Sequence, residues 1–165
     1  MNPRIVEVRS LVELAEVALE WTATEIMEPI PKLVLMRGEM GSGKTTFVSK
    51  VADVLGAPGA ASPSFALHTR YTGIRGSIDH FDLDRLTSAE DLESTGFWDI
   101  VSEASQDTVQ GPGRFVMIEW AERLEEFGAA TDGARWTSRF RGWNFHFEGP
   151  PRFRVRFGLL NSQKI

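Results

Sequence analysis

The sequence predicts an α/β fold, and three observations carry this prediction. An apolar, extended stretch at residues 32–36 leads into a glycine-rich loop at 38–45, and a helical pattern follows to about residue 55. Two further extended stretches lead into carboxylates, Asp82 and Glu119. Near the C-terminus, two stretches of alternating apolar and polar residues flank a Gly-Pro-Pro turn, as in an antiparallel hairpin. The order strand, glycine loop, helix is typical of the three-layer, P-loop NTPase-like fold.

The loop matches the phosphate-binding pattern G-x-x-x-x-G-K-[ST] at every required position. Glycines lack a Cβ, so the backbone can wrap a phosphate and turn its N–H groups inward, at the positive end of the next helix. Lys44 can reach the β- and γ-phosphate oxygens, and the Thr45 hydroxyl can ligate Mg²⁺. A glycine-rich turn that binds nothing is the weaker interpretation. The residues expected to bind the nucleotide are Glu39, Met40, Gly41, Ser42, Gly43, Lys44, Thr45 and Thr46.

The composition is that of a soluble globular protein. With 165 residues, 42% hydrophobic and 25% charged, residues 1–165 are predicted to form a single domain. No apolar run approaches the roughly 18 residues of a membrane span, and residues 1–10 have no signal-peptide core. The absence of cysteine excludes disulfides and thiolate metal sites. We therefore expect a cytoplasmic protein that does not enter a membrane.

Charge is distributed unevenly along the chain. The net charge is −5, yet residues 1–132 hold 11 basic and 22 acidic residues, while 133–165 hold seven basic residues and one acid. A basic, aromatic tail on an acidic body suggests a polyanion or an acidic protein as partner. Arg152, Arg154 and Arg156 share one face of the last predicted strand. They form either a contact for an RNA backbone or the charged protection of an exposed edge strand.

Local patterns predict the elements of the first half. A short strand is expected at 4–8, and a helix begins after Ser10, where Ser10 and Glu13 form a capping box. Pro29 and Pro31 end that helix before the strand that leads into the loop. The helix after the loop ends at Gly56 and Pro58.

The second half alternates strands with short helices. Strands are expected at 65–71 and 77–81 around a turn at 73–76, and at 115–119. A second capping box, Ser88 with Asp91, opens a short helix that Gly96 ends. Further helical segments are expected at 97–104 and 121–127, and residues 131–142 are predicted to be loop. The final hairpin carries Trp143, Phe145, Phe147, Phe153, Val155 and Phe157 on one face.

A phosphate-binding loop needs a carboxylate partner for its metal, and Glu119 is the first candidate. Mg²⁺ takes one or two carboxylates from a protein and keeps several waters. Glu119 ends a run of apolar residues at the carboxyl end of a predicted strand, where doubly wound sheets place ligand contacts. We therefore predict Thr45 and Glu119 as the metal ligands. The alternative is an ordinary strand-end acid that faces solvent.

Asp82 is the second carboxylate candidate. It also ends a predicted strand, where it could hold a Mg²⁺-bound water or orient the attacking water. If the strand continues, Asp82 and Asp84 share a face while Asp79 points away. A solvated acidic strand end is the competing interpretation.

Two further residues complete the site hypotheses. Ser64 lies in a loop that could reach the γ-phosphate, although Ser-Pro-Ser is also a common turn sequence. His80 could be a catalytic base, but a structural role suits it better. The predicted catalytic group is therefore Asp82, Lys44 and Ser64, and no zinc site is proposed.

Several motifs, in this order, resemble the bacterial TsaE (YjeE) family. Its loop G-D-L-G-A-G-K-T-T is matched by residues 38–46, and its S-P-T-F by residues 62–65. Its H-x-D-L-Y-R-L is matched by 80–86, and L-E-x-x-G by 92–96. Its apolar strand ending in E-W is matched by 115–120. The resemblance covers about residues 5–127, and the combination is far more specific than the phosphate loop alone.

The resemblance implies a function as well as a fold. It implies an ATP-binding α/β fold with a mixed, mainly parallel central sheet, Mg²⁺, and weak ATP hydrolysis. It also implies association with TsaD and TsaB in threonylcarbamoyladenosine modification of tRNA, where ATP resets the partner complex and any contact with tRNA is through that complex. It assigns Thr45 and Glu119 to Mg²⁺, places Asp82 near the reaction, and aligns Ser64 with a switch-like threonine.

The chain departs from the family pattern at a few positions. Glu39 and Met40 replace Asp and Leu, and Ser64 keeps the hydroxyl of the family's threonine. Asp84 stands where the family has tyrosine, which puts any contact made there in doubt. Leu14 occupies the place of a threonine near the adenine.

Two other classes of protein remain as alternatives. A small-molecule kinase would use Asp82 to activate an acceptor hydroxyl and Arg85 to neutralise transferred charge, but no segment reads plainly as a lid. A nucleotide-dependent binding module without meaningful turnover would use the carboxylates only to hold metal. A GTPase is disfavoured because the chain has no Asn-Lys-x-Asp motif.

Overall fold

A seven-stranded sheet forms the centre of the molecule, in the order β1-β7-β6-β2-β5-β4-β3. The computed structural model describes residues 4–57, 59, 67–106, 113–129, 136–149 and 154–160. Pairing is parallel between β2 and β5, β2 and β6, and β4 and β5, and antiparallel at the remaining junctions. The predicted mixed sheet is thereby confirmed, and it is the central strands that pair in parallel. The strands are β1 (Arg4–Glu7), β2 (Lys32–Gly38), β3 (His68–Gly73), β4 (Gly76–Asp82), β5 (Gly113–Glu119), β6 (Arg141–Glu148) and β7 (Arg154–Leu159).

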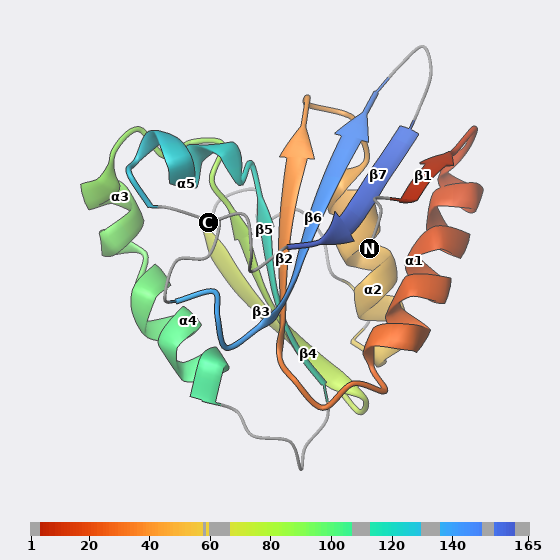
Figure 1. Ribbon diagram of the computed structural model, residues 1–165, viewed down its shortest axis with the longest axis horizontal. Coiled ribbons are helices and arrows are strands. Elements are labelled where there is room, and N and C mark those ends of the chain that lie inside the picture. The colour runs from red at the N-terminus through yellow and green to blue at the C-terminus, as the bar shows by residue number, and fades with distance from the viewer. Residues whose placement is uncertain are drawn as a thin grey trace.

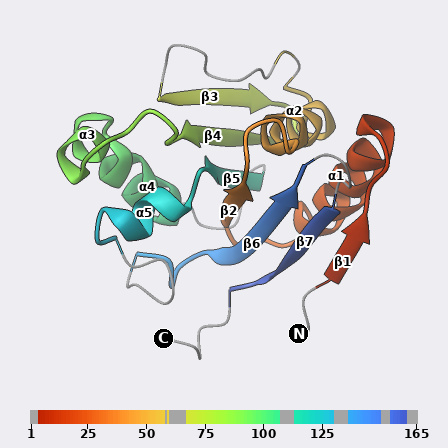
Figure 2. The ribbon, with the colours of Figure 1, turned by 90° about the horizontal axis from the view of Figure 1, so that it is seen from above.

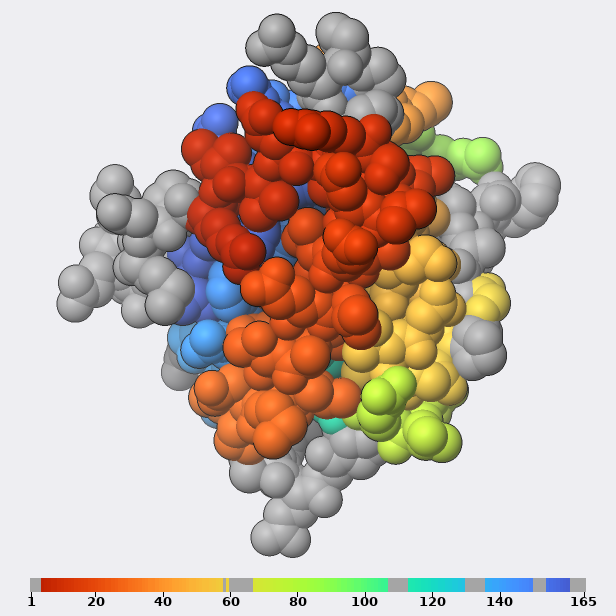
Figure 3. All heavy atoms as spheres, turned by 90° about the vertical axis from the view of Figure 1, so that its right-hand side faces the viewer, coloured from red at the N-terminus to blue at the C-terminus, as the bar shows by residue number. Residues whose placement is uncertain are grey.

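Helices cover both faces of this sheet, which gives three layers (Figures 1 and 2). One face carries α1 (Leu11–Glu25) and α2 (Lys44–Leu55), which pack side by side. Seen from that side, the two helices hide most of the sheet (Figure 3). The other face carries α3 (Ala89–Ser94), α4 (Phe97–Gln106) and α5 (Glu122–Glu126). In the part of the chain that the structure describes, no helix has the length and apolarity needed to cross a bilayer.

The central strand β2 is buried on both faces because helices cover both. Successive side chains of a strand point to opposite faces. Leu33 and Leu35 accordingly enter the core beneath α3, α4 and α5, while Val34 and Met36 enter the core beneath α1 and α2. The near-continuous apolar run that predicted this strand is the pattern expected for a parallel strand covered on both sides.

The described aromatic residues of the C-terminal hairpin belong to the core under α1 and α2, and Phe153 lies outside the described residues. Phe145 and Phe157 stack with ring centroids 4.9 Å apart, and Trp21 of α1 meets Phe145 edge-on at 5.3 Å. Trp143 and Phe147 are buried beside them. Aromatic pairs of this kind add about 0.5–1.5 kcal/mol each beyond their buried area. The concentration of aromatic residues in this segment therefore has a packing role.

The hairpin is confirmed, but two predictions about it are corrected. β6 begins at Arg141, inside the stretch predicted as loop at 131–142. The exposed-edge alternative for the arginine strand is wrong, since β7 lies between β6 and β1. A strand with one solvated face has the same alternating pattern inside a sheet as at its edge. Arg154 pairs with Glu7 of β1 at 3.2 Å, and Arg152 lies outside the described residues.

Both predicted capping serines cap their helices. Ser10 Oγ accepts a hydrogen bond from the Glu13 N–H at 3.2 Å, and Ser88 Oγ accepts one from the Asp91 N–H at 3.1 Å. The acids reach back to the residue before the serine, since Glu13 accepts from the Arg9 N–H at 2.7 Å. These bonds satisfy N–H groups that the first helical turn leaves without partners.

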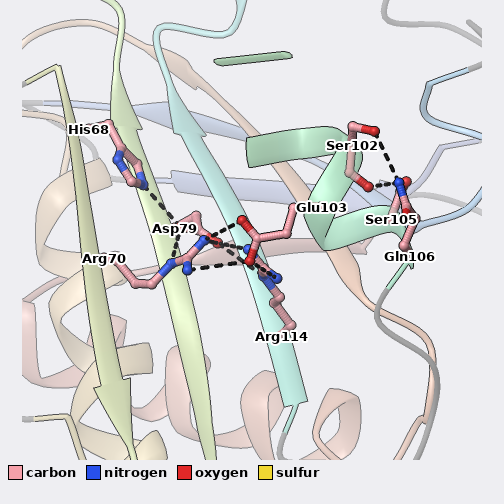
Figure 4. A network of polar contacts seen from close by, with 8 residues as sticks. All are labelled: His68, Arg70, Asp79, Ser102, Glu103, Ser105, Gln106 and Arg114. Atoms are coloured by element: carbon pink, nitrogen blue, oxygen red, sulfur yellow. Dashed lines mark hydrogen bonds and ion pairs between the residues drawn. The ribbon is translucent and has the colours of Figure 1, made fainter. Parts of the chain in front are cut away.

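A charged cluster on the α4 side of the sheet is centred on Asp79 (Figure 4). The carboxylate is fully buried and accepts hydrogen bonds from Arg70 Nε at 2.7 Å and from an Arg114 nitrogen at 2.9 Å. His68 Nε2 lies 3.0 Å away, and the exposed Glu103 of α4 bridges the two guanidinium groups. Burial acts to raise the pKa of Asp79, but these donors outweigh it and lower the pKa to about 2. As expected, Asp79 points away from Asp82.

We predict that Asp79→Asn lowers the free energy of unfolding at pH 7 by about 3 kcal/mol, because it leaves two arginines without their buried counter-charge. The contribution of the parental carboxylate is complete above about pH 4 and is lost as the pH falls toward 2. Urea unfolding at several pH values should therefore show the difference between parent and variant shrinking over that range. Glu103→Gln is the control, with an exposed carboxylate worth less than about 1 kcal/mol. A variant as stable as the parent at pH 7 would contradict the assignment.

Candidate nucleotide-binding site

The glycine-rich loop joins the carboxyl end of β2 to the start of α2, at the centre of the sheet (Figure 1). Gly38, Gly41 and Gly43 have φ values of 135°, 75° and 102°, which are conformations that residues with a Cβ rarely adopt. Gly38 also lies against β6, where a Cβ would stand 2.2 Å from the carbonyl oxygen of Phe147. The glycines are therefore required by backbone geometry at the point where the loop leaves the sheet.

The N-terminus of α2 differs from those of α1 and α3. Gly43 is its N-cap residue, no side chain caps it, and its first turn contains no acidic residue. The other two helices have a capping serine and an acid in that turn. The start of α2 thus keeps its positive dipole end, which favours an anion.

Lys44 folds back over this loop. Its Nζ donates hydrogen bonds to the carbonyl oxygens of Gly38 at 2.6 Å and Glu39 at 2.8 Å. The same ammonium lies 4.3 Å from the ring centroid of Trp120, within cation–π range. Burial lowers the pKa of Lys44, and the nearby carboxylates of Glu119 and Glu122 oppose that shift.

Trp120 holds this position through an unusual backbone conformation. Its φ is 57°, the one positive value at a residue other than glycine among those described. Conformations of this kind cost on the order of 1–3 kcal/mol and cluster at functional sites. The sequence marked Trp120 only as part of the Glu-Trp pair, so its contact with Lys44 is new information from the structure.

Glu119 lies inside the site and does not face solvent. It ends β5, is 2% exposed, and its Oε2 accepts a hydrogen bond from Thr45 Oγ1 at 3.1 Å. Its Oε1 lies 2.9 Å from Nε2 of His80, on the neighbouring strand β4. The structure thus brings together the two residues predicted as metal ligands, and it adds His80 to them.

Asp82 lies beside Glu119 in the register of β4 and β5. It is partly buried at the end of β4, and its Oδ1 accepts a hydrogen bond from the Asp84 N–H at 3.1 Å. Burial raises the pKa of Asp82, the charge of Glu119 raises it further, and the bond from Asp84 opposes the shift. The site therefore contains two adjacent carboxylates, those of Asp82 and Glu119.

The remaining predicted residues lie in varied places. Glu39 and Met40 are exposed and line an open hollow of about 390 Å³ shared with Trp120, Glu122 and His146. Ser42 is buried, and its Oγ is one of the few buried side-chain polar atoms without a partner in the described part of the chain. Thr46 follows Thr45 in the first turn of α2. Ser64 lies outside the described residues.

These residues fit a Mg²⁺–triphosphate. An uncapped helix start, an ammonium group on the loop and a hydroxyl beside a buried carboxylate supply the donors, charge and oxygen ligands that such a group takes. A buried hydroxyl without a partner, on Ser42, adds a further polar group in the loop. Leu14 of α1 lies close to Gly43, where a Cβ would stand 2.9 Å from its Cδ2.

Strand, phosphate loop and helix in this arrangement define a P-loop NTPase-like fold. The crystal structure of Bacillus subtilis YdiB has the same fold, with a TM-score of 0.60 at 18% identity, and the match covers 98% of this chain and 88% of that one. The sequence identifies a narrower family than the fold does. The family model described as "Threonylcarbamoyl adenosine biosynthesis protein TsaE" matches residues 9–141, and the chain belongs to this family.

Individual relatives support the same membership. Proteins described as tRNA threonylcarbamoyladenosine biosynthesis protein TsaE are 40% identical over 93 residues in Treponema pallidum and 32% identical over 94 residues in Borreliella burgdorferi. These matches cover 56% and 57% of this chain and 62% and 63% of the relatives. The Rickettsia prowazekii relative is 28% identical over 134 residues, which is 80% of this chain and 72% of the relative. The chain thus spans about half to two thirds of the length of the first relatives it matches.

We predict that Gly38→Ala lowers the free energy of unfolding by more than about 3 kcal/mol, because it adds both φ strain and a clash with the β6 backbone. Gly41→Ala is the matched control, since its φ is also positive but no atom lies within 4 Å of the added Cβ. That variant should lose about 1–2 kcal/mol. Equal losses in urea unfolding would show that the contact with Phe147 is not the constraint.

Proposed function

We propose that the protein binds Mg²⁺–ATP, hydrolyses it slowly, and acts in threonylcarbamoyladenosine modification of tRNA. The single observation that carries the proposal is the contact between Thr45 and Glu119 at 3.1 Å. It joins the residue that ends the phosphate loop to a buried strand-end carboxylate 74 positions away in the chain. Family membership supports the tRNA-modification role.

In this proposal, the loop recognises the phosphates. The N–H groups at the start of α2 face the anion, and its dipole adds to their attraction. Lys44 exchanges its bonds to the Gly38 and Glu39 carbonyls for phosphate oxygens. The ring of Trp120 remains beside the ammonium and limits its contact with water.

Two residues would hold the metal. They are Thr45, through Oγ1, and Glu119, through Oε2, which lie 3.1 Å apart. When bound, Mg²⁺ neutralises charge on the β- and γ-phosphates and acts as a Lewis acid. In this proposal Asp82, whose pKa burial raises, orients a water and accepts its proton.

Family membership supports the proposed cellular role. TsaD and TsaB are the proposed partners, and nucleotide binding and hydrolysis reset their complex between turnovers. Contact with tRNA is indirect, through that complex. The site of action is the cytoplasm, where tRNA modification takes place.

We predict that Lys44→Ala abolishes ATP binding or hydrolysis, because it removes the only loop side chain that carries a positive charge. Isothermal titration with ATP and Mg²⁺ measures the affinity directly. Lys50→Ala is the control on the same helix, with an exposed side chain paired to Asp53. Unchanged affinity in Lys44→Ala would overturn the assignment of the loop.

Asp82→Ala should lower turnover more than binding, because the side chain is placed to handle the attacking water and not the phosphates. The expected loss is about 10²–10⁴-fold in hydrolysis rate, measured by phosphate release at saturating ATP. Asp84→Ala keeps the backbone N–H that bonds to Asp82 and serves as the control. Hydrolysis at the parental rate would remove Asp82 from the mechanism.

Capture of TsaD and TsaB should depend on the nucleotide. We expect the immobilised protein to retain both partners when ATP and Mg²⁺ are present and to release them when ATP is absent. The reason is that the proposed cycle links the affinity for the partners to occupation of the nucleotide site. The Lys44→Ala variant should lose this dependence. An acceptor-dependent transfer of phosphate, without capture of either partner, would instead identify a kinase.

A further inference from the structure

His80 is a buried polar residue that phosphate binding alone does not require. It lies in β4 between β3 and β5, and its side chain is fully buried. Nε2 lies 2.9 Å from Glu119 Oε1, while Nδ1 has no partner among the described residues. An ionised carboxylate only accepts hydrogen bonds, so the ring hydrogen belongs on Nε2 and the free lone pair on Nδ1.

Glu119 uses both of its oxygens in this arrangement. A buried carboxylate is costly unless donors satisfy it. Thr45 of α2 donates to Oε2, and His80 of β4 donates to Oε1. The two bonds end on different oxygens of the carboxylate. His80 therefore fixes the rotation of the carboxylate group and keeps Oε2 directed at Thr45.

We infer that His80 is a positioning residue, which holds the Glu119 carboxylate in the orientation needed to bind Mg²⁺ with Thr45. This inference rests on the proposed function, because His80 would orient a ligand of the metal site proposed there. Partners that orient a ligand in this way affect metal affinity strongly, and their loss typically costs 10–100-fold. A merely structural histidine would change the stability of the fold without changing the Mg²⁺ dependence of nucleotide binding.

Two amide substitutions distinguish a role in positioning Glu119 from a role in stabilising the fold. The side-chain amide of Gln can place its NH₂ group near the position of Nε2, whereas the shorter Asn places it near Nδ1 and does not reach Glu119. His80→Gln should therefore preserve the donor and His80→Asn should remove it. Both variants keep a polar, uncharged side chain at the same buried position.

The measurement is a Mg²⁺ titration of the affinity for a fluorescent ATP analogue, with EDTA as the metal-free reference. His80→Asn should shift the Mg²⁺ midpoint upward by about 10–100-fold and leave the metal-free affinity unchanged. His80→Gln should titrate close to the parent. Should Asn prevent folding, His80→Leu provides the same comparison against Gln.

A second histidine supplies the matched control. His68 also contacts a buried carboxylate, Asp79, at 3.0 Å, but on the face of the sheet opposite the site. His68→Asn should therefore lower stability and leave the Mg²⁺ midpoint unchanged. The inference is overturned if His80→Asn titrates like the parent, or if Gln and Asn shift the midpoint equally. A parent protein without any Mg²⁺ dependence would instead refute the proposed function.

Discussion

The need to satisfy one buried carboxylate governs the geometry of the site. Glu119 is 2% exposed, and its two donors come from different elements, Thr45 of α2 and His80 of β4. Its backbone is also held in place, because its carbonyl oxygen accepts a hydrogen bond from the Leu83 N–H just after β4. A shift of either element would remove one of the two donors from a buried carboxylate, which is costly. The phosphate loop, tied to α2, is therefore positioned by the same constraint.

Two charged clusters on opposite faces of the sheet differ in how their groups are paired. On the α4 side, Asp79 accepts bonds from two arginines, so its charge is fully used within the fold. On the α2 side, the helix start is uncapped and Lys44 is bound only to carbonyl oxygens and an aromatic ring. Polar groups whose partners can be exchanged are the ones available to a ligand. The alternation of β4, which sends Asp79 to one face and His80 to the other, separates the Asp79 cluster from the proposed nucleotide-binding site.

Local features of the sequence predicted the loop, the capped helices and both strand-end carboxylates, because each depends on residues close together in the chain. The partner of Glu119 could not be found in this way. The contact with His80 joins residues 39 positions apart and depends on the register of β4 against β5. The position of Trp120 depends on its positive φ, and nothing in the residues around it in the sequence predicts that conformation. The interior position of β7 was missed for the same reason, since its neighbour β1 is nearly the whole chain away.

The pairing of β1 with β7 has a consequence for folding. β1 completes its ladder with β7, from Arg4 opposite Phe157 to Glu7 opposite Arg154. No other strand pair in the described sheet is as far apart in the chain. Pairings this distant in sequence form slowly, because closing a long loop costs entropy before any contact is gained. The β1–β7 ladder therefore has the largest loop-closure cost of the sheet.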